Sequence, residues 1–151
     1  MTAWGLKEVT QSEEILTNDG FFPNVSIADF QNQFHQVSNT DSQKIKYQLI
    51  NSMIEVNHDL KELKASATQS TLAETDTEEV AGQNVLETHY FRSVFSHAKG
   101  NLLPIIMDVM TKEKADSLET NREELKREFL AVSNQAIRTL LGLDSATVAL
   151  I

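Results

Sequence analysis

The chain contains no cysteine, and this absence excludes several classes of site. Without thiols there is no disulfide framework, no thiolate metal centre and no cysteine nucleophile. A reducing compartment is therefore the simpler setting to expect for this protein.

Glycine, proline and long apolar runs are also scarce. The five glycines are scattered, so no glycine-rich loop is available to cradle a phosphate, and no Gly-x-Ser-x-Gly elbow occurs. No window approaches the apolar length of a membrane span, and we expect no membrane association. The N-terminus carries Trp4, Glu8 and Glu13 in place of a basic stretch and an apolar run, so no signal peptide is expected.

Positive charge is in short supply. Lys and Arg number 13 against 22 Asp and Glu, and the formal net charge of −9 argues against a large nucleic-acid footprint. The acidic side chains concentrate in one segment that lacks Lys and Arg: Glu74, Asp76, Glu78, Glu79 and Glu87. This segment is either a solvated loop or a surface that repels DNA or meets a basic partner.

What the chain does have is helical periodicity over a length of 151 residues, enough for one domain with a core. Ser26-x-x-Asp29 predicts the cap of a short helix, and Thr40-x-x-Gln43 predicts the cap of a long one. A third helix is expected to open at Gln83 or Asn84, with a kink between Gly100 and Pro104. A fourth is expected to open at Asp116 or Thr120 and to end before Gly142.

The sequence therefore predicts an all-α fold, a bundle of about four helices, one short and three long, with extended arms at both ends. We expect an N-terminal arm at 1–25, a helical domain at 26–142 and a C-terminal docking tail at 143–151. Residues 66–82, rich in Ser, Thr, Ala and Glu, predict a mobile connection.

The long helix has apolar residues on two sides. One face repeats at intervals of three and four: Ile45, Leu49, Met53, Val56, Leu60 and Leu63. A second stripe, Tyr47, Ile50 and Ile54, lies off that face. Such a helix is either central to its own bundle or packed against a neighbouring subunit, so these three residues are candidate interface anchors.

The search for a catalytic or metal site gives a negative result. Glu55-x-x-His58 places a carboxylate and an imidazole on one helical face, as in di-iron bundles, but those sites need two such motifs and two further Glu residues. We expect a polar stripe there, no catalytic residue, no metal and no cofactor. A bundle metalloenzyme stays open as the less favoured alternative.

Two apolar features point to assembly instead. Phe21 and Phe22, before a helix cap, are either a lid on the domain's own core or anchors at an interface. The chain ends in a strand-like run whose apolar side chains need an edge to bind, and Thr147, Val148, Leu150 and Ile151 are candidate docking residues. Their partner is either the N-terminal arm or another chain.

Several segments together resemble the head completion proteins of temperate contractile-tailed phages, over roughly residues 18–151. The likeness lies in the order and spacing of these segments: Asn18-Asp19-Gly20-Phe21-Phe22-Pro23 followed by Phe30 and Phe34; Met53-Ile54-Glu55-Val56-Asn57-His58-Asp59-Leu60; His89-Tyr90-Phe91-Arg92 with Ala98-Lys99; and Ile137-Arg138 through Leu141-Gly142 to Thr147-Val148-Ala149-Leu150-Ile151.

The resemblance implies a non-enzymatic virion protein, assembled in the host cytoplasm and located at the head–tail interface. Its relatives bind the portal after DNA packaging and form a ring, expected to follow the portal's twelvefold symmetry. That ring receives a neck or tail-terminator protein, and packaged DNA passes through it without specific binding. A helical adaptor unrelated to virions remains the alternative from the residues alone.

Overall fold

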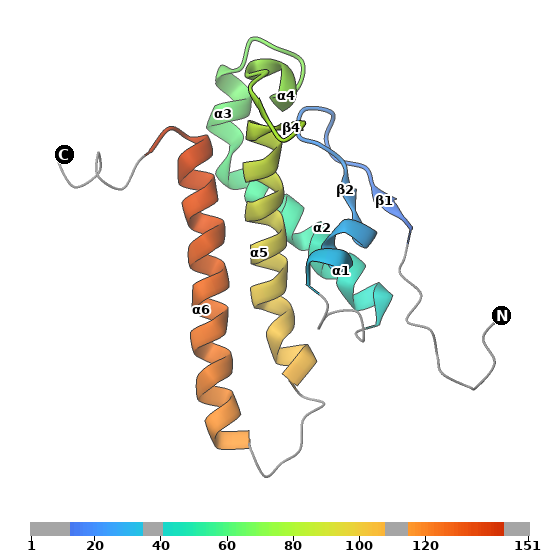
Figure 1. The fold of residues 1–151 in the computed structure, drawn as a ribbon, viewed down its shortest axis with the longest axis vertical. Helices are drawn as coiled ribbons and strands as arrows, with labels where there is room; N and C mark the ends of the chain where they lie inside the picture. The colour runs from blue at the N-terminus through green and yellow to red at the C-terminus, as the bar shows by residue number, and fades with distance from the viewer. Residues whose placement is uncertain (1–12, 35–40, 108–114, 144–151) are drawn as a thin grey trace.

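The structure, a computed structural model, describes residues 13–34, 41–107 and 115–143, with the side chains of 104–107 and 115–120 left out (Figure 1). Its helices are α1 (Ile27–Gln33), α2 (Ser42–Asp59), α3 (Lys61–Ser66), α4 (Leu72–Thr75), α5 (Val85–Met107) and α6 (Ala115–Leu140). Two antiparallel hairpins join β1 (Ile15–Leu16) to β2 (Val25–Ser26) and β3 (Glu79–Val80) to β4 (Gln83–Asn84). The predicted all-α class, with one short and three long helices, is confirmed.

Helix α5 is the centre of the fold. It packs along its length against α6 on one side and against α2 on the other (Figure 1). The β1–β2 hairpin lies on the α2 side of α5 (Figure 1), and α1 is followed by its C-cap Phe34, whose ring meets Phe129 of α6 edge-on at 5.8 Å between centroids. This order places the N-terminal hairpin beside α2.

Side-chain caps fix where the helices begin. The Asp29 N–H donates to Ser26 Oγ (3.1 Å) and the Glu87 N–H donates to Asn84 Oδ1 (3.0 Å), so the predicted Ser26 cap and the Asn84 alternative are confirmed. The cap predicted at Thr40 is wrong: α2 is capped one residue later by Asp41, whose Oδ1 accepts from the Gln43 N–H at 2.9 Å. Asp is as good a cap as Thr, and the pattern alone did not separate the two neighbours.

The end of α6 follows its predicted glycine. Gly142 has φ +74°, its N–H donates to the Thr139 carbonyl (3.0 Å), and the Leu143 N–H donates to the Arg138 carbonyl (2.8 Å). These two bonds are those of a Schellman motif, which favours glycine because a Cβ disfavours the left-handed conformation. The other end differs from prediction, because α6 begins at Ala115, before both proposed caps.

Helix α5 continues through Pro104 to Met107, and the kink between Gly100 and Pro104 stays a prediction. The nearby Gly100 serves close packing: a Cβ there would lie 3.3 Å from Phe129 Cβ and 3.4 Å from the Lys126 carbonyl oxygen. The missing side chain therefore lets α5 and α6 approach closely.

The segment 66–82, predicted to be a mobile connection, contains secondary structure. Within it lie α4 and most of the β3–β4 hairpin, and Leu72 of α4 is fully buried. The Asn84 side chain ties the segment together by donating to the carbonyls of Ala73 (3.2 Å) and Asp76 (2.8 Å). The polar composition of the segment did not indicate that Leu72 would be buried and would hold the segment against the core.

The core reaches into the predicted N-terminal arm. The described part of that arm, residues 13–25, supplies four buried side chains to the same cluster as the helices: Leu16, Phe21, Phe22 and Val25. The remaining core members come mainly from α1, α2, α5 and the end of α6. Among the described residues, no helix has the length and apolarity needed to cross a bilayer.

Candidate partner-binding surface

The second apolar stripe of α2 faces solvent. Tyr47 is 70% exposed and Ile54 is 60% exposed, and Ile50 between them is also exposed. Ile15 on β1, beside this stripe, is 56% exposed. The first stripe of α2 is buried against α5, so its outward stripe has no cover among the described residues.

A groove runs between the N-terminal hairpin and this stripe. It has a volume of about 550 Å³, and its apolar lining is Ile15, Leu16, Ile50, Met53 and Ile54. Polar contacts cross it at both ends. Lys46 Nζ lies 2.7 Å from Glu14 Oε2 at one end, and Asn57 Nδ2 donates to Asn18 Oδ1 (2.9 Å) at the other.

One wall of the groove is a strand edge with which no other strand of the described ranges pairs. The Ile27 N–H donates to the Glu14 carbonyl (3.2 Å), and Ile15 is paired with Ser26 in the antiparallel register. In such a ladder alternate residues direct their backbone groups to opposite sides. Glu14 therefore bonds to Ile27 just after β2, Leu16 faces Val25 of β2, and the N–H and C=O of Ile15 point away from β2.

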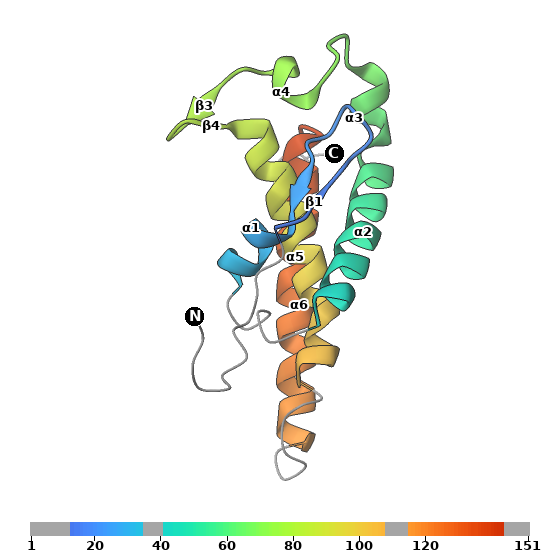
Figure 2. The same cartoon turned by 90° about the vertical axis from the view of Figure 1, so that its right-hand side faces the viewer.

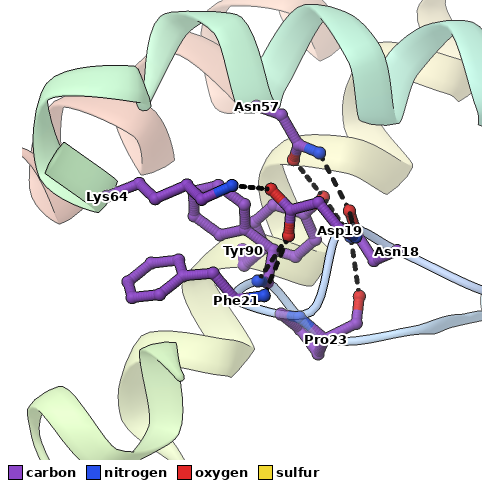
Figure 3. Close-up of polar contacts among 8 residues, drawn as sticks. Asn18, Asp19, Phe21, Pro23, Asn57, Lys64 and Tyr90 are labelled. Atoms are coloured by element: carbon purple, nitrogen blue, oxygen red, sulfur yellow. Dashed lines mark hydrogen bonds and ion pairs between the residues drawn. The ribbon is translucent and has the colours of Figure 1, made fainter. Parts of the chain in front are cut away.

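A polar network holds the hairpin loop beside α2 and α5 (Figure 3). The Tyr90 hydroxyl donates to Asn57 Oδ1 (2.6 Å) and accepts from Asn18 Nδ2 (2.8 Å), which also reaches the Pro23 carbonyl (2.8 Å). Tyr90 is fully buried, and that burial raises the pKa of its phenol. The hydroxyl therefore stays protonated and can serve as donor and acceptor at once.

Asp19 closes the same loop. Its Oδ1 accepts from the N–H groups of Phe21 and Phe22, both at 3.0 Å, and its Oδ2 lies 3.0 Å from Lys64 Nζ (Figure 3). Burial acts to raise the pKa of this carboxyl, but the Phe22 N–H, Lys64 and the Phe21 N–H outweigh it, so the pKa is lowered. The carboxylate thus fixes the turn at Gly20, whose φ is +94°.

The sequence-predicted binding residues separate into three groups. Tyr47, Ile50 and Ile54 lie together on the exposed stripe. Phe21 and Phe22 lie in the core, with Phe22 stacked on Tyr90 at 5.0 Å between ring centroids. Thr147, Val148, Leu150 and Ile151 lie outside the described residues.

Sequence reasoning missed Ile15 and the Asn18–Asn57–Tyr90 network. The turn signal Asn18-Asp19-Gly20 marked the loop, but its partners are 39 and 72 positions further along the chain. Nothing in the local pattern indicates contacts at that separation.

The Glu55-x-x-His58 motif is solvent-facing on α2, and no group of three or more His, Asp or Glu side chains is gathered for a metal within the described ranges. A different histidine is held more tightly. His97 Nδ1 lies 2.7 Å from Ser52 Oγ and 3.3 Å from Asn101 Nδ2. Since the amide nitrogen can only donate, Nδ1 accepts, and the imidazole is neutral.

This geometry predicts an acid-sensitive fold. Burial lowers the pKa of His97, against the opposing effect of Glu55 and Asp59. A lowered pKa leaves stability intact above about pH 6.5 and removes it as the pH falls through the folded-state value, because the unfolded chain then binds the extra proton. We expect Tm to fall by several degrees from pH 7.5 to pH 5.

The His97→Gln variant should lose part of this pH dependence in calorimetry, since its side chain cannot titrate. His58→Gln, on the exposed side of α2, is the matched control and should retain it. Equal pH profiles for His97→Gln and the parent chain would contradict the assignment.

The chain is similar to known phage proteins. The family model described as "Phage head completion protein (GPL)" matches residues 16–151. The probable head completion/stabilization protein of Haemophilus phage HP1 is 27% identical over 144 residues, which cover 92% of this chain and 93% of the relative. No solved structure matches the chain. The family match takes in all of α2 and the hairpin from Leu16 onward.

Proposed function

Because the chain belongs to the phage head completion protein family, we propose that it forms a ring on the portal after DNA packaging and joins the head to the neck or tail. As a member, it is a structural component of the phage head and not an enzyme. The family membership leaves the non-viral adaptor and the bundle metalloenzyme without support. The proposal of a ring on the portal rests above all on the exposed stripe of α2.

That stripe is costly for an isolated subunit. Burying apolar area contributes about 25 cal/mol per Å². A partner that covers Tyr47 and Ile54 would therefore stabilise the assembly. Contiguous exposed apolar groups are a mark of interaction surfaces. A face that meets a different face of the next copy generates a closed ring when the rotation closes, and a twelvefold ring would match the portal.

The exposed acidic segment supports the proposal that the ring surrounds the passing DNA. Glu74, Asp76, Glu78 and Glu79 are all exposed, at the end of the molecule that carries α4 and the β3–β4 hairpin (Figure 2). Carboxylates repel the phosphate backbone, so such a surface lets DNA pass without holding it. If the segment is only a solvated hairpin, neutralising these charges should not change the passage of DNA.

The proposal is tested by adding the purified chain to DNA-filled heads prepared without it. We expect the chain to cosediment with these heads and to appear in electron micrographs as a ring at one vertex. Empty heads without portal are the control. Binding that is equal with and without the portal would contradict the proposal.

Deleting residues 144–151 is expected to abolish this recruitment, because the apolar tail is a proposed docking element. The deletion leaves Leu143 and the Schellman motif in place, so Tm should stay within a few degrees of the parent value. The Ala149→Ser substitution is the matched control and should bind normally. Unchanged recruitment of the deleted chain would exclude the tail from docking.

A further inference from the structure

We propose that the C-terminal tail of one copy binds as an added strand in the groove between β1 and α2 of the next copy in the ring. This inference rests on the proposed ring. It assigns the groove of about 550 Å³ to residues 147–151 of a neighbouring chain.

The free edge of β1 supplies the backbone contacts. The N–H and C=O of Ile15 point away from β2, toward the side on which α2 completes the groove. An extended peptide placed there can pair with Ile15 and continue the sheet from two strands to three. Strand addition of this kind gains affinity from main-chain hydrogen bonds and specificity from pockets for alternate side chains.

The length of the groove matches the tail. Its polar ends are Glu14 and Asn18 on the hairpin, four residues apart and so about 13 Å along an extended chain. On α2 the same ends are Lys46 and Asn57, eleven residues apart and about 16 Å along the helix. A strand of four or five residues fills about 13–16 Å, which is the length of Thr147–Ile151.

The side chains also match. Alternation puts Val148 and Leu150 on one face of the added strand. The α2 wall that this face would meet presents Ile50, Met53 and Ile54. Between its polar ends the described lining is mostly apolar, so an apolar strand leaves few polar groups without a partner.

The position of the end of α6 favours a tail from another copy. Helix α6 and β1 lie on opposite sides of α5, and a helix with its side chains is about 10–12 Å across (Figure 1). Only residues 144–146 separate Leu143, at the end of α6, from Thr147, so the two Cα atoms can be at most about 14 Å apart. A tail of the same copy would have to pass around α5 within that length, so the tail of a neighbouring copy is the occupant that we assign to the groove.

The lack of native cysteine allows a direct test. The full-length Ile54→Cys/Leu150→Cys double variant is assembled on DNA-filled heads, oxidised and run on a non-reducing gel. We expect a ladder of dimers and higher species, because each copy offers one thiol to each neighbour. Mixing the two single variants should yield dimers only. The Val132→Cys/Leu150→Cys variant, with its first thiol on the exposed face of α6, is the matched control and should give no ladder.

A second variant tests the backbone contact. Ile15→Pro removes an N–H that the hairpin itself does not use, and proline is accepted on strand edges whose N–H faces outward. It should keep the parent Tm within a few degrees and weaken the ladder of the double variant.

The outcomes separate the two proposals. Rings that form on heads without a ladder, or a disulfide confined within single chains, would overturn the tail–groove contact and leave the connector role intact. Failure of the parent chain to bind DNA-filled heads would overturn the connector role, and the tail–groove contact with it.

Discussion

Replacing Phe22 with alanine is expected to destabilise the fold by about 3–5 kcal/mol, the cost typical of removing a buried phenylalanine. Phe22 is 3% exposed, stacks on Tyr90 with an interplanar angle of 9°, and meets Phe21 edge-on at 4.9 Å between centroids. Its loss would also weaken the cover over the Asn18–Asn57–Tyr90 hydrogen bonds. Urea unfolding followed by circular dichroism measures the change.

The matched control is Tyr47→Ala, an aromatic truncation at a side chain that is 70% exposed. Surface substitutions of this kind usually change stability by less than about 0.5 kcal/mol. A cost for Phe22→Ala as small as that of Tyr47→Ala would mean that the hairpin loop contributes little to the core. Phe22 would then be free to act as an interface anchor.

The helices were predictable because their signals are local. The three-and-four spacing from Ile45 to Leu60 marks one buried face, and Ser26 and Asn84 cap helices through residues only three positions away. Gly142 was predictable for the same reason, since the Schellman bonds close within six residues.

The N-terminal hairpin was not predictable in this way. Each of its strands has two residues, too short for alternation to be visible, and its loop is held by Asn57, Lys64 and Tyr90 from distant elements. The predicted arm therefore concealed a structural element that both completes the core and forms one wall of the groove.

Only the α2 side of the candidate site was predictable from the sequence. The two-sided pattern of α2 identified Tyr47, Ile50 and Ile54, because a stripe off the buried face needs some other cover. The other half, Ile15 and the free edge of β1, depends on the register Ile15–Ser26 and on the placement of the hairpin beside α2. Such placement is a tertiary property and leaves no period in the sequence.

The Ile54→Asp variant is expected to lose attachment to DNA-filled heads while keeping its fold. Ile54 is 60% exposed in the isolated subunit, so a carboxylate there stays hydrated and Tm should move by no more than a few degrees. In an assembled ring the same carboxylate would be buried against apolar groups without a partner, at a cost of several kcal/mol. Since about 1.4 kcal/mol is a factor of ten, the concentration for half-saturation of heads should rise at least about tenfold.

Glu55→Ala is the matched control, because it alters the exposed neighbour of Ile54 on the same helix without adding a charge to the stripe. Cosedimentation across a concentration series measures both variants against the parent chain. If Ile54→Asp and Glu55→Ala bind alike, the stripe is not a contact surface, and it stays exposed to solvent in the assembled virion. If Ile54→Asp alone fails, the outward side of α2 is shown to be covered on assembly, and the cysteine ladder then identifies whether the tail of the next copy provides that cover.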